Sequence, residues 1–129
     1  MDLYRYARYV LADQFQVNEV QPGLLCVMGP FSFGDGQFIE VYVREDSDGL
    51  ELMYYSGLAE TLTLEALGEH RNRSTGAVLF ERHGLQLHRD RLGTRTTRDR
   101  LLDSVIEFND ALRDLDRLSR EVGQRKLNP

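Results

Sequence analysis

The chain has 129 residues, of which 41% are hydrophobic and 29% charged, and a formal net charge of −5. This length predicts a single domain with enough apolar surface to fold without a metal or a disulfide. Cys26 is the only cysteine, which excludes an internal disulfide and any zinc or iron–sulfur site built from several cysteines. Because the sequence has neither a membrane-length apolar run nor a secretory-signal pattern, we expect a cytoplasmic protein with no membrane contact, cofactor or metal.

The charges are unevenly distributed along the chain. Residues 1–60 carry three arginines and ten acids, whereas residues 61–129 carry thirteen basic and eleven acidic residues. The basic excess is concentrated between Arg71 and Arg100, where eight arginines accompany three acids. This distribution predicts a molecule with an acidic and a basic region.

Helical spacing of apolar residues predicts a first helix over residues 2–13. Tyr4 lies beside its apolar face and is a candidate contact residue, because tyrosine combines a large apolar body with a hydroxyl. We expect a loop around residues 18–23. The apolar face of the helix consists of Leu3, Ala7, Val10 and Leu11.

Three strands are predicted next. The apolar run Leu24–Met28 is bounded by Pro22-Gly23 and Gly29-Pro30, and Cys26 in its middle is expected to be a small buried side chain. Alternation predicts a strand over Gln37–Arg44 with Ile39, Val41 and Val43 on the core side, and the Asp48-Gly49 turn connects it to a strand over Leu50–Tyr55.

The next segment is expected to supply cover for this sheet and a fourth strand. A helix is predicted from Ser56 or Thr61 to about Leu67, and another after Ser74 or Thr75, carrying Val78 and Phe80 and ending at Gly84. Residues 85–89 alternate as a strand, and residues 89–91 are expected to turn away from the sheet.

The clearest element is an amphipathic helix over residues 98–122, with Thr96 and Asp99 spaced as a capping box. Its apolar seam and its acidic stripe lie on opposite sides. We treat the stripe as a candidate surface for a cationic partner. The seam comprises Leu101, Val105, Phe108, Leu112, Leu115, Leu118 and Val122, and the stripe comprises Asp99, Asp103, Glu107, Asp110, Asp114 and Glu121.

Together these elements predict an α+β fold, in which a small antiparallel sheet of three to four strands is covered by helices and the C-terminal helix is longest. Residues 1–122 form the expected domain, and residues 123–129 a short polar tail.

No pattern typical of an enzyme is present. His70, His83 and His88 could act as bases, but no serine lies in a sequence motif typical of a catalytic nucleophile. We therefore interpret all three histidines as surface or structural residues. A nuclease of the restriction-enzyme type would use Asp35 and Glu40, but position 42, where such a site needs lysine, is Tyr42. We therefore expect a protein that is not an enzyme.

The order of elements resembles the domain of unknown function 1828 family of small bacterial and phage proteins. The matching residues are Gly29-Pro30-Phe31-Ser32-Phe33-Gly34-Asp35-Gly36 and Ile39-Glu40-Val41-Tyr42-Val43. Where that family usually has Asp-Asp-Gly after the third strand, this chain has Tyr55-Ser56-Gly57, which puts any role of that acidic pair in doubt. The resemblance implies an α+β fold and an origin on prophages or mobile elements, without an established activity.

We therefore predict a protein-interaction protein, an inhibitor of a host defence complex in the manner of an anti-CRISPR, whose partner is a protein such as a nucleic-acid-binding complex. The alternative is a nucleic-acid-binding accessory protein that uses the arginines of residues 71–100, with Arg89 and Arg91 as candidates. The net negative charge opposes this alternative. Self-association as a homodimer is left open.

Overall fold

The protein is described by a computed structural model that covers residues 2–47, 49–56, 78–81, 85–93 and 96–127. Within these residues, two helices accompany one antiparallel sheet, whose six strands are ordered β1-β2-β3-β4-β6-β5. None of the described helices combines the length and apolar character needed to cross a bilayer. The elements are α1 (Leu3–Leu11), β1 (Gln16–Gln21), β2 (Leu24–Ser32), β3 (Phe38–Asp46), β4 (Gly49–Ser56), β5 (Val78–Glu81), β6 (Leu85–Leu92) and α3 (Arg98–Leu127).

The α+β prediction is confirmed, and β2, β3, β4 and β6 are the four strands that the sequence predicted. The sheet is wider because β1 and β5 extend its two edges. Residues 18–21, predicted as a loop, belong to β1, an exposed edge strand that forms through backbone pairing with β2 and therefore shows little apolar alternation. Val78–Glu81, predicted as helix, is β5, since a short apolar run fits either structure.

Other boundaries shift without changing the arrangement. β2 continues past Gly29-Pro30 to Ser32, with an irregular register beyond Met28. β6 continues through residues 89–91, which were predicted to turn away, because they pair with β4. The helix predicted to end near Leu67 lies outside the described residues.

Helix α1 begins after Asp2, whose Oδ1 accepts a hydrogen bond of 2.8 Å from the Arg5 amide. It is shorter than predicted and buries one face against the sheet and α3. The buried residues of this helix are Tyr4, Ala7, Val10 and Leu11.

The central strands direct one set of side chains to the helices. Ile39, Val41 and Val43 are fully buried, as predicted from their alternation. Gly49, which starts β4, has a φ of +148°, and a Cβ there would lie 2.0 Å from the Leu92 carbonyl oxygen. Only glycine therefore fits where the β3–β4 turn meets the end of β6.

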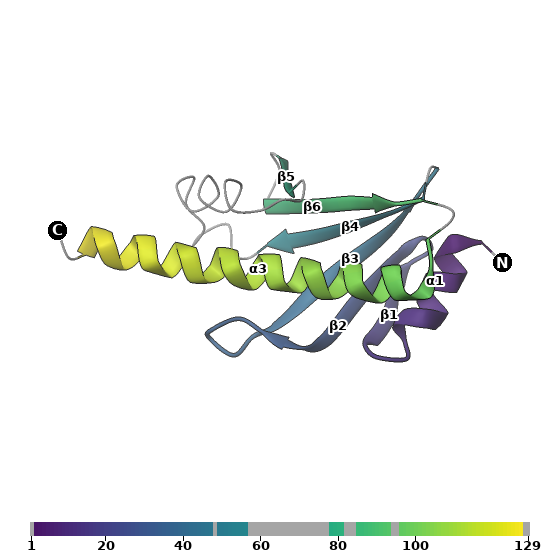
Figure 1. The fold of residues 1–129 in the computed structure, drawn as a ribbon, viewed down its shortest axis with the longest axis horizontal. Helices are drawn as coiled ribbons and strands as arrows, with labels where there is room; N and C mark the ends of the chain where they lie inside the picture. The colour runs from purple at the N-terminus through teal and green to yellow at the C-terminus, as the bar shows by residue number, and fades with distance from the viewer. Residues whose placement is uncertain (1, 48, 57–77, 82–84, 94–95, 128–129) are drawn as a thin grey trace.

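Helix α3 runs across the sheet (Figure 1), and its apolar seam is buried along its whole length. The N-terminal cap of α3 differs from the predicted capping box of Thr96 and Asp99. The Thr97 Oγ1 accepts from the Arg100 amide at 3.2 Å, whereas the Thr96 hydroxyl donates to the Gly93 carbonyl. The helix also continues beyond Val122 to Leu127, so most of the predicted polar tail is helical.

Replacing Leu112 by alanine should lower the free energy of unfolding by about 2–5 kcal/mol, because its buried side chain would leave a cavity between α3 and the sheet. Leu127→Ala, at a side chain that is 82% exposed, is the matched control and should change stability by less than about 0.5 kcal/mol. Urea unfolding measures both. Equal effects would show that the seam does not hold α3 on the sheet.

Candidate interaction surface

The outer face of α3, defined by the predicted acidic stripe, lies opposite the buried seam. Asp99, Asp103 and Asp110 are exposed, whereas Glu107 and Asp114 are half-buried. The helical period of 3.6 residues accounts for this segregation, since it places these acids on the side turned away from the sheet.

The two halves of this face differ in their ion pairs. In the C-terminal half, Arg117 lies 2.5 Å from Asp114 and 4.0 Å from Glu121, and the hydrogen bond from Arg117 to Asp114 raises the pKa of the guanidinium. Glu107 lies 3.8 Å from Arg100. Over the part of the chain that the structure describes, Asp99, Asp103 and Asp110 have no ion pair or hydrogen bond from their side chains. The unneutralised charge is therefore concentrated in the N-terminal half.

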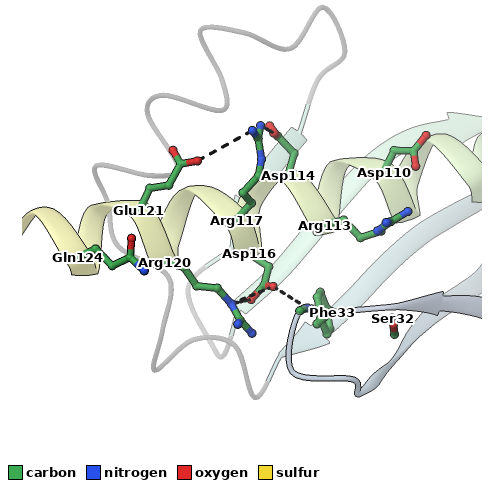
Figure 2. A pocket seen from close by; sticks show the side chains of 11 residues that line it. Ser32, Phe33, Asp110, Arg113, Asp114, Asp116, Arg117, Arg120, Glu121 and Gln124 are labelled. Carbon is green, nitrogen blue, oxygen red and sulfur yellow. Dashed lines mark hydrogen bonds and ion pairs between the residues drawn. The ribbon is translucent and has the colours of Figure 1, made fainter.

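A groove of about 630 Å³ adjoins the C-terminal half of this face, between α3 and the β2–β3 hairpin (Figure 2). Its wall includes Asp116, a carboxylate that is only 6% exposed. The Asp116 Oδ2 accepts from the Gly34 amide at 3.2 Å and lies 3.3 Å from the Arg120 Nε. Asp116 therefore connects the β2–β3 hairpin to α3 through its hydrogen bond with Gly34.

Sequence reasoning missed Asp116. An acid within an apolar seam signals a specific buried partner, because an unpaired carboxylate is costly to bury. That signal was present at position 116, but the partner, a backbone amide 82 residues earlier in the chain, has no sequence signature.

Aromatic side chains support the hairpin end of the groove. The Phe33 ring meets the Tyr54 ring edge-on, with centroids 5.9 Å apart. The Arg113 guanidinium lies 6.0 Å from the centroid of Phe31, within cation–π range. Arg113 and several carboxylates therefore line the groove, and Phe31 lies beside it.

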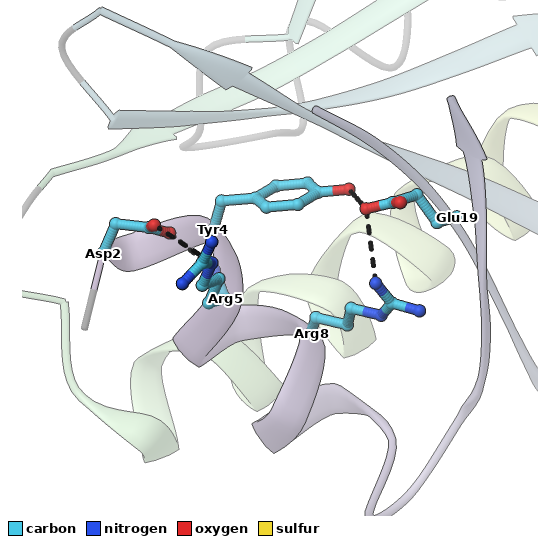
Figure 3. Close-up of polar contacts among 5 residues, drawn as sticks. All are labelled: Asp2, Tyr4, Arg5, Arg8 and Glu19. Carbon is cyan, nitrogen blue, oxygen red and sulfur yellow. Dashed lines mark hydrogen bonds and ion pairs between the residues drawn. The ribbon is translucent and has the colours of Figure 1, made fainter. Parts of the chain in front are cut away.

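Tyr4 does not contribute to this surface, which corrects the prediction that it is a contact residue. Its side chain is only 8% exposed, and its hydroxyl donates to the Glu19 carboxylate (Figure 3). Arg8 Nη1 lies 3.3 Å from the same carboxylate oxygen. Burial and Glu19 raise the pKa of Tyr4 to about 12. Tyr4 therefore joins α1 to β1.

The predicted basic segment is only partly described. Arg89 and Arg91 belong to β6, opposite Leu52 and Glu51 of β4, and their role in contacts stays a prediction. At the end of the segment, Arg98 lies 3.0 Å from Asp13. Together with the Arg100–Glu107 pair, this contact shows that two arginines of the segment already face carboxylates within the fold.

The residues considered for catalysis have local roles. Asp35 accepts from the Gln37 amide at 2.9 Å in the hairpin turn, and Glu40 accepts from the Tyr42 hydroxyl at 3.3 Å on the sheet. Burial raises the pKa of the Cys26 thiol, which disfavours a reactive thiolate. Within the described residues, no group of three or more histidine, cysteine or acidic side chains could hold a metal ion. His70 and His83 lie outside those residues.

Comparisons with protein-family models, with curated proteins and with solved structures found no match to this chain. The resemblance to the domain of unknown function 1828 family therefore stays a prediction.

Replacing Asp116 by alanine should lower the free energy of unfolding by about 1–3 kcal/mol, because the Gly34 amide and the Arg120 guanidinium lose their acceptor. Asp116→Asn should cost less, since its amide oxygen can still accept. Asp110→Ala on the exposed face is the control and should have an effect within about 0.5 kcal/mol. If urea unfolding showed equal losses of unfolding free energy for Asp116→Ala and Asp110→Ala, the role of Asp116 in connecting the hairpin to α3 would be contradicted.

Stability should decrease as the pH rises from about 10 to about 12. Burial is the largest cause that raises the pKa of Tyr4, Tyr42 and Tyr54 to about 12 each. Because unfolded tyrosine ionises near 10, the unfolded chain releases protons in this interval that the folded chain retains, and alkali favours unfolding. Urea unfolding across this interval measures the effect. Tyr54→Phe should reduce the decrease, and a free energy of unfolding that stays constant above pH 10 would contradict it.

Proposed function

We propose that this protein is a non-enzymatic interaction module that binds a positively charged protein through the outer face of α3. One observation carries the proposal. Asp99, Asp103 and Asp110 are exposed on one side of a firmly packed helix and have no ion pair with any described residue.

These acids add little to the stability of the fold. Asp99 and Asp103 are four residues apart, as are Asp103 and Glu107, and like charges at this spacing destabilise a helix by a few tenths of a kcal/mol per pair. Only Asp99 offsets this cost, because it lies in the first turn, where the helix dipole favours an acid. The same acids that repel one another would attract a cationic partner.

The geometry also limits the shape of the partner. With a rise of 1.5 Å per residue, Asp99 and Asp110 are about 16 Å apart along the helix axis. An array of this length fits an extended basic segment or a basic groove. Because the array belongs to a rigid helix, little conformational freedom is lost when a partner binds.

The groove beside Asp116 would add selectivity. Long-range attraction to the exposed acids increases the association rate for any cationic protein. The neighbouring Arg113 and Arg117 would repel a partner that is basic along its whole length, so the preferred partner carries its positive charge opposite the N-terminal half of α3.

A nucleic-acid-binding defence complex of a bacterial host fits this description, since it presents basic grooves that normally hold phosphates. Acting on such a complex in the cytosol, as a protein from a phage or a mobile element, is the more specific form of the proposal. Direct nucleic-acid binding through the arginines of residues 71–100 is the alternative. DNA-binding measurements in low and physiological salt distinguish the two, because only the alternative requires affinity for DNA alone.

Replacing Asp99, Asp103 and Asp110 together by asparagine should weaken binding to a synthetic arginine-rich peptide by at least about tenfold at low salt, mainly through a slower association rate. Biolayer interferometry over a range of salt concentrations measures this. The variant should unfold within about 1 kcal/mol of the wild type, since only mutual repulsion and the dipole interaction change.

A charge-matched control separates location from total charge. The triple variant Asp35→Asn, Glu40→Gln and Glu45→Gln also removes three negative charges, but from β3 and the β2–β3 hairpin. It should keep most of the peptide affinity. If both triple variants lost affinity equally, net charge alone would explain the binding, and the outer face of α3 would have no special role.

A further inference from the structure

Arg113 is an exposed cation beside the acids of the outer face of α3, and within the described residues no carboxylate pairs with it. The next two arginines of the helix, Arg117 and Arg120, are paired with carboxylates. Asp110 precedes Arg113 by three residues, a spacing at which ion pairs often form, yet these two side chains form none (Figure 2). An unneutralised acid and an unneutralised base therefore lie next to each other at the groove.

Phe31 holds this cation in a position from which it can bind a carboxylate. The Arg113 guanidinium lies 6.0 Å from the centroid of the Phe31 ring, and the ring attracts the positive charge. All five N–H donors of a guanidinium lie in its own plane, where they match the two oxygens of a carboxylate. Because the cation is held before a partner arrives, less side-chain freedom is lost on binding.

The charges around Arg113 favour a carboxylate over a phosphate. Four acids and three arginines line the groove. A carboxylate carries one negative charge, which Arg113 alone can balance. A phosphate group carries about 1.5 to 2 negative charges at neutral pH, so the neighbouring acids repel it more strongly.

The exposed residues that lead along α3 to Arg113 have the spacing of a helix-packing surface. Asp99, Asp103, Ile106, Asp110 and Arg113 follow one another at intervals of four, three, four and three residues. Helices pack along one another with this alternation of three and four. Ile106, in the middle, is half-buried and offers an apolar contact between the charges. We call these five residues the mixed row of α3.

We propose, as an extension that rests on the proposed function, that the cationic partner contributes a helix of mixed charge to this row. Its basic residues lie opposite Asp99, Asp103 and Asp110, and a carboxylate of the same helix binds Arg113. The helix runs antiparallel to α3, the orientation in which the two helix dipoles attract. Arg113 then determines selectivity, because it repels a helix that is basic throughout and binds one that ends in an acid.

Two peptides test this proposal by the order of their affinities. The first is a synthetic alanine-based helix that repeats the spacing of the mixed row in antiparallel order. It carries arginines opposite the three acids, leucine opposite Ile106 and glutamate opposite Arg113. The second has glutamine in place of that glutamate, and its net positive charge is therefore higher by one.

Net charge and local pairing predict opposite orders. Attraction to an acidic protein by net charge alone favours the glutamine peptide. We expect the glutamate peptide to bind at least about twofold more tightly at low salt, as for an exposed ion pair. Fluorescence anisotropy measures both affinities.

Variants of Arg113 show whether this residue causes the order. Arg113→Gln should reverse it, so that the glutamine peptide binds more tightly. Arg113→Lys keeps the charge without the planar fork and should preserve the order with a smaller ratio. Arg5→Gln removes the same charge from the exposed surface of α1 and, as the matched control, should keep the wild-type order. Circular dichroism spectra confirm that each variant is folded.

The possible failures are distinguishable. Equal affinities for the wild type, tighter binding of the glutamine peptide, or an unchanged order in Arg113→Gln would overturn the mixed-charge helix and leave the proposed function standing. If neither peptide bound, both proposals would fail. A third peptide, with phosphoserine in place of the glutamate, should bind less tightly than the glutamate peptide. Tighter binding would show that the anion is a phosphate and would overturn the choice of a carboxylate.

Discussion

The packing of the α3 seam on the inner face of the sheet is the interaction on which the rest of the structure depends. Ile39, Val41 and Val43 form one side of this contact, and Phe108, Leu112 and Leu115 belong to the same core. Burying large side chains from both layers supplies most of the free energy available to a chain of this length. It also fixes the rotation of α3 about its axis, and therefore the direction in which every polar residue of that helix points.

The rotation of α3 explains why Asp116 and Asp110 behave so differently. They are six residues apart, and this spacing turns them to different sides of the helix. Asp110 points to solvent, whereas Asp116 reaches the hairpin and accepts from the Gly34 amide. Arg120, one turn later, closes the same site. Of these two aspartates, the buried Asp116 is therefore the one that contacts other parts of the fold.

Sequence patterns could predict the parts of this fold that depend on one period. The helical period of α3 and the alternation of Ile39, Val41 and Val43 predicted which residues are buried, because one-sided burial imposes those repeats. Edge strands cannot be predicted in this way. β1 is held by backbone pairing with β2 and exposes most of its side chains, so its sequence shows little apolar pattern. Tyr4 was misinterpreted because its partner, Glu19, belongs to that unrecognised strand.

The candidate surface was predictable only in part for a related reason. A helical wheel identifies which acids share a side, and it predicted the outer face of α3 correctly as a set of residues turned away from the seam. It does not identify their partners. Arg117 neutralises Asp114 and Glu121, while Asp99 and Asp103 stay without an ion pair in the described part of the chain, a division that depends on side-chain positions.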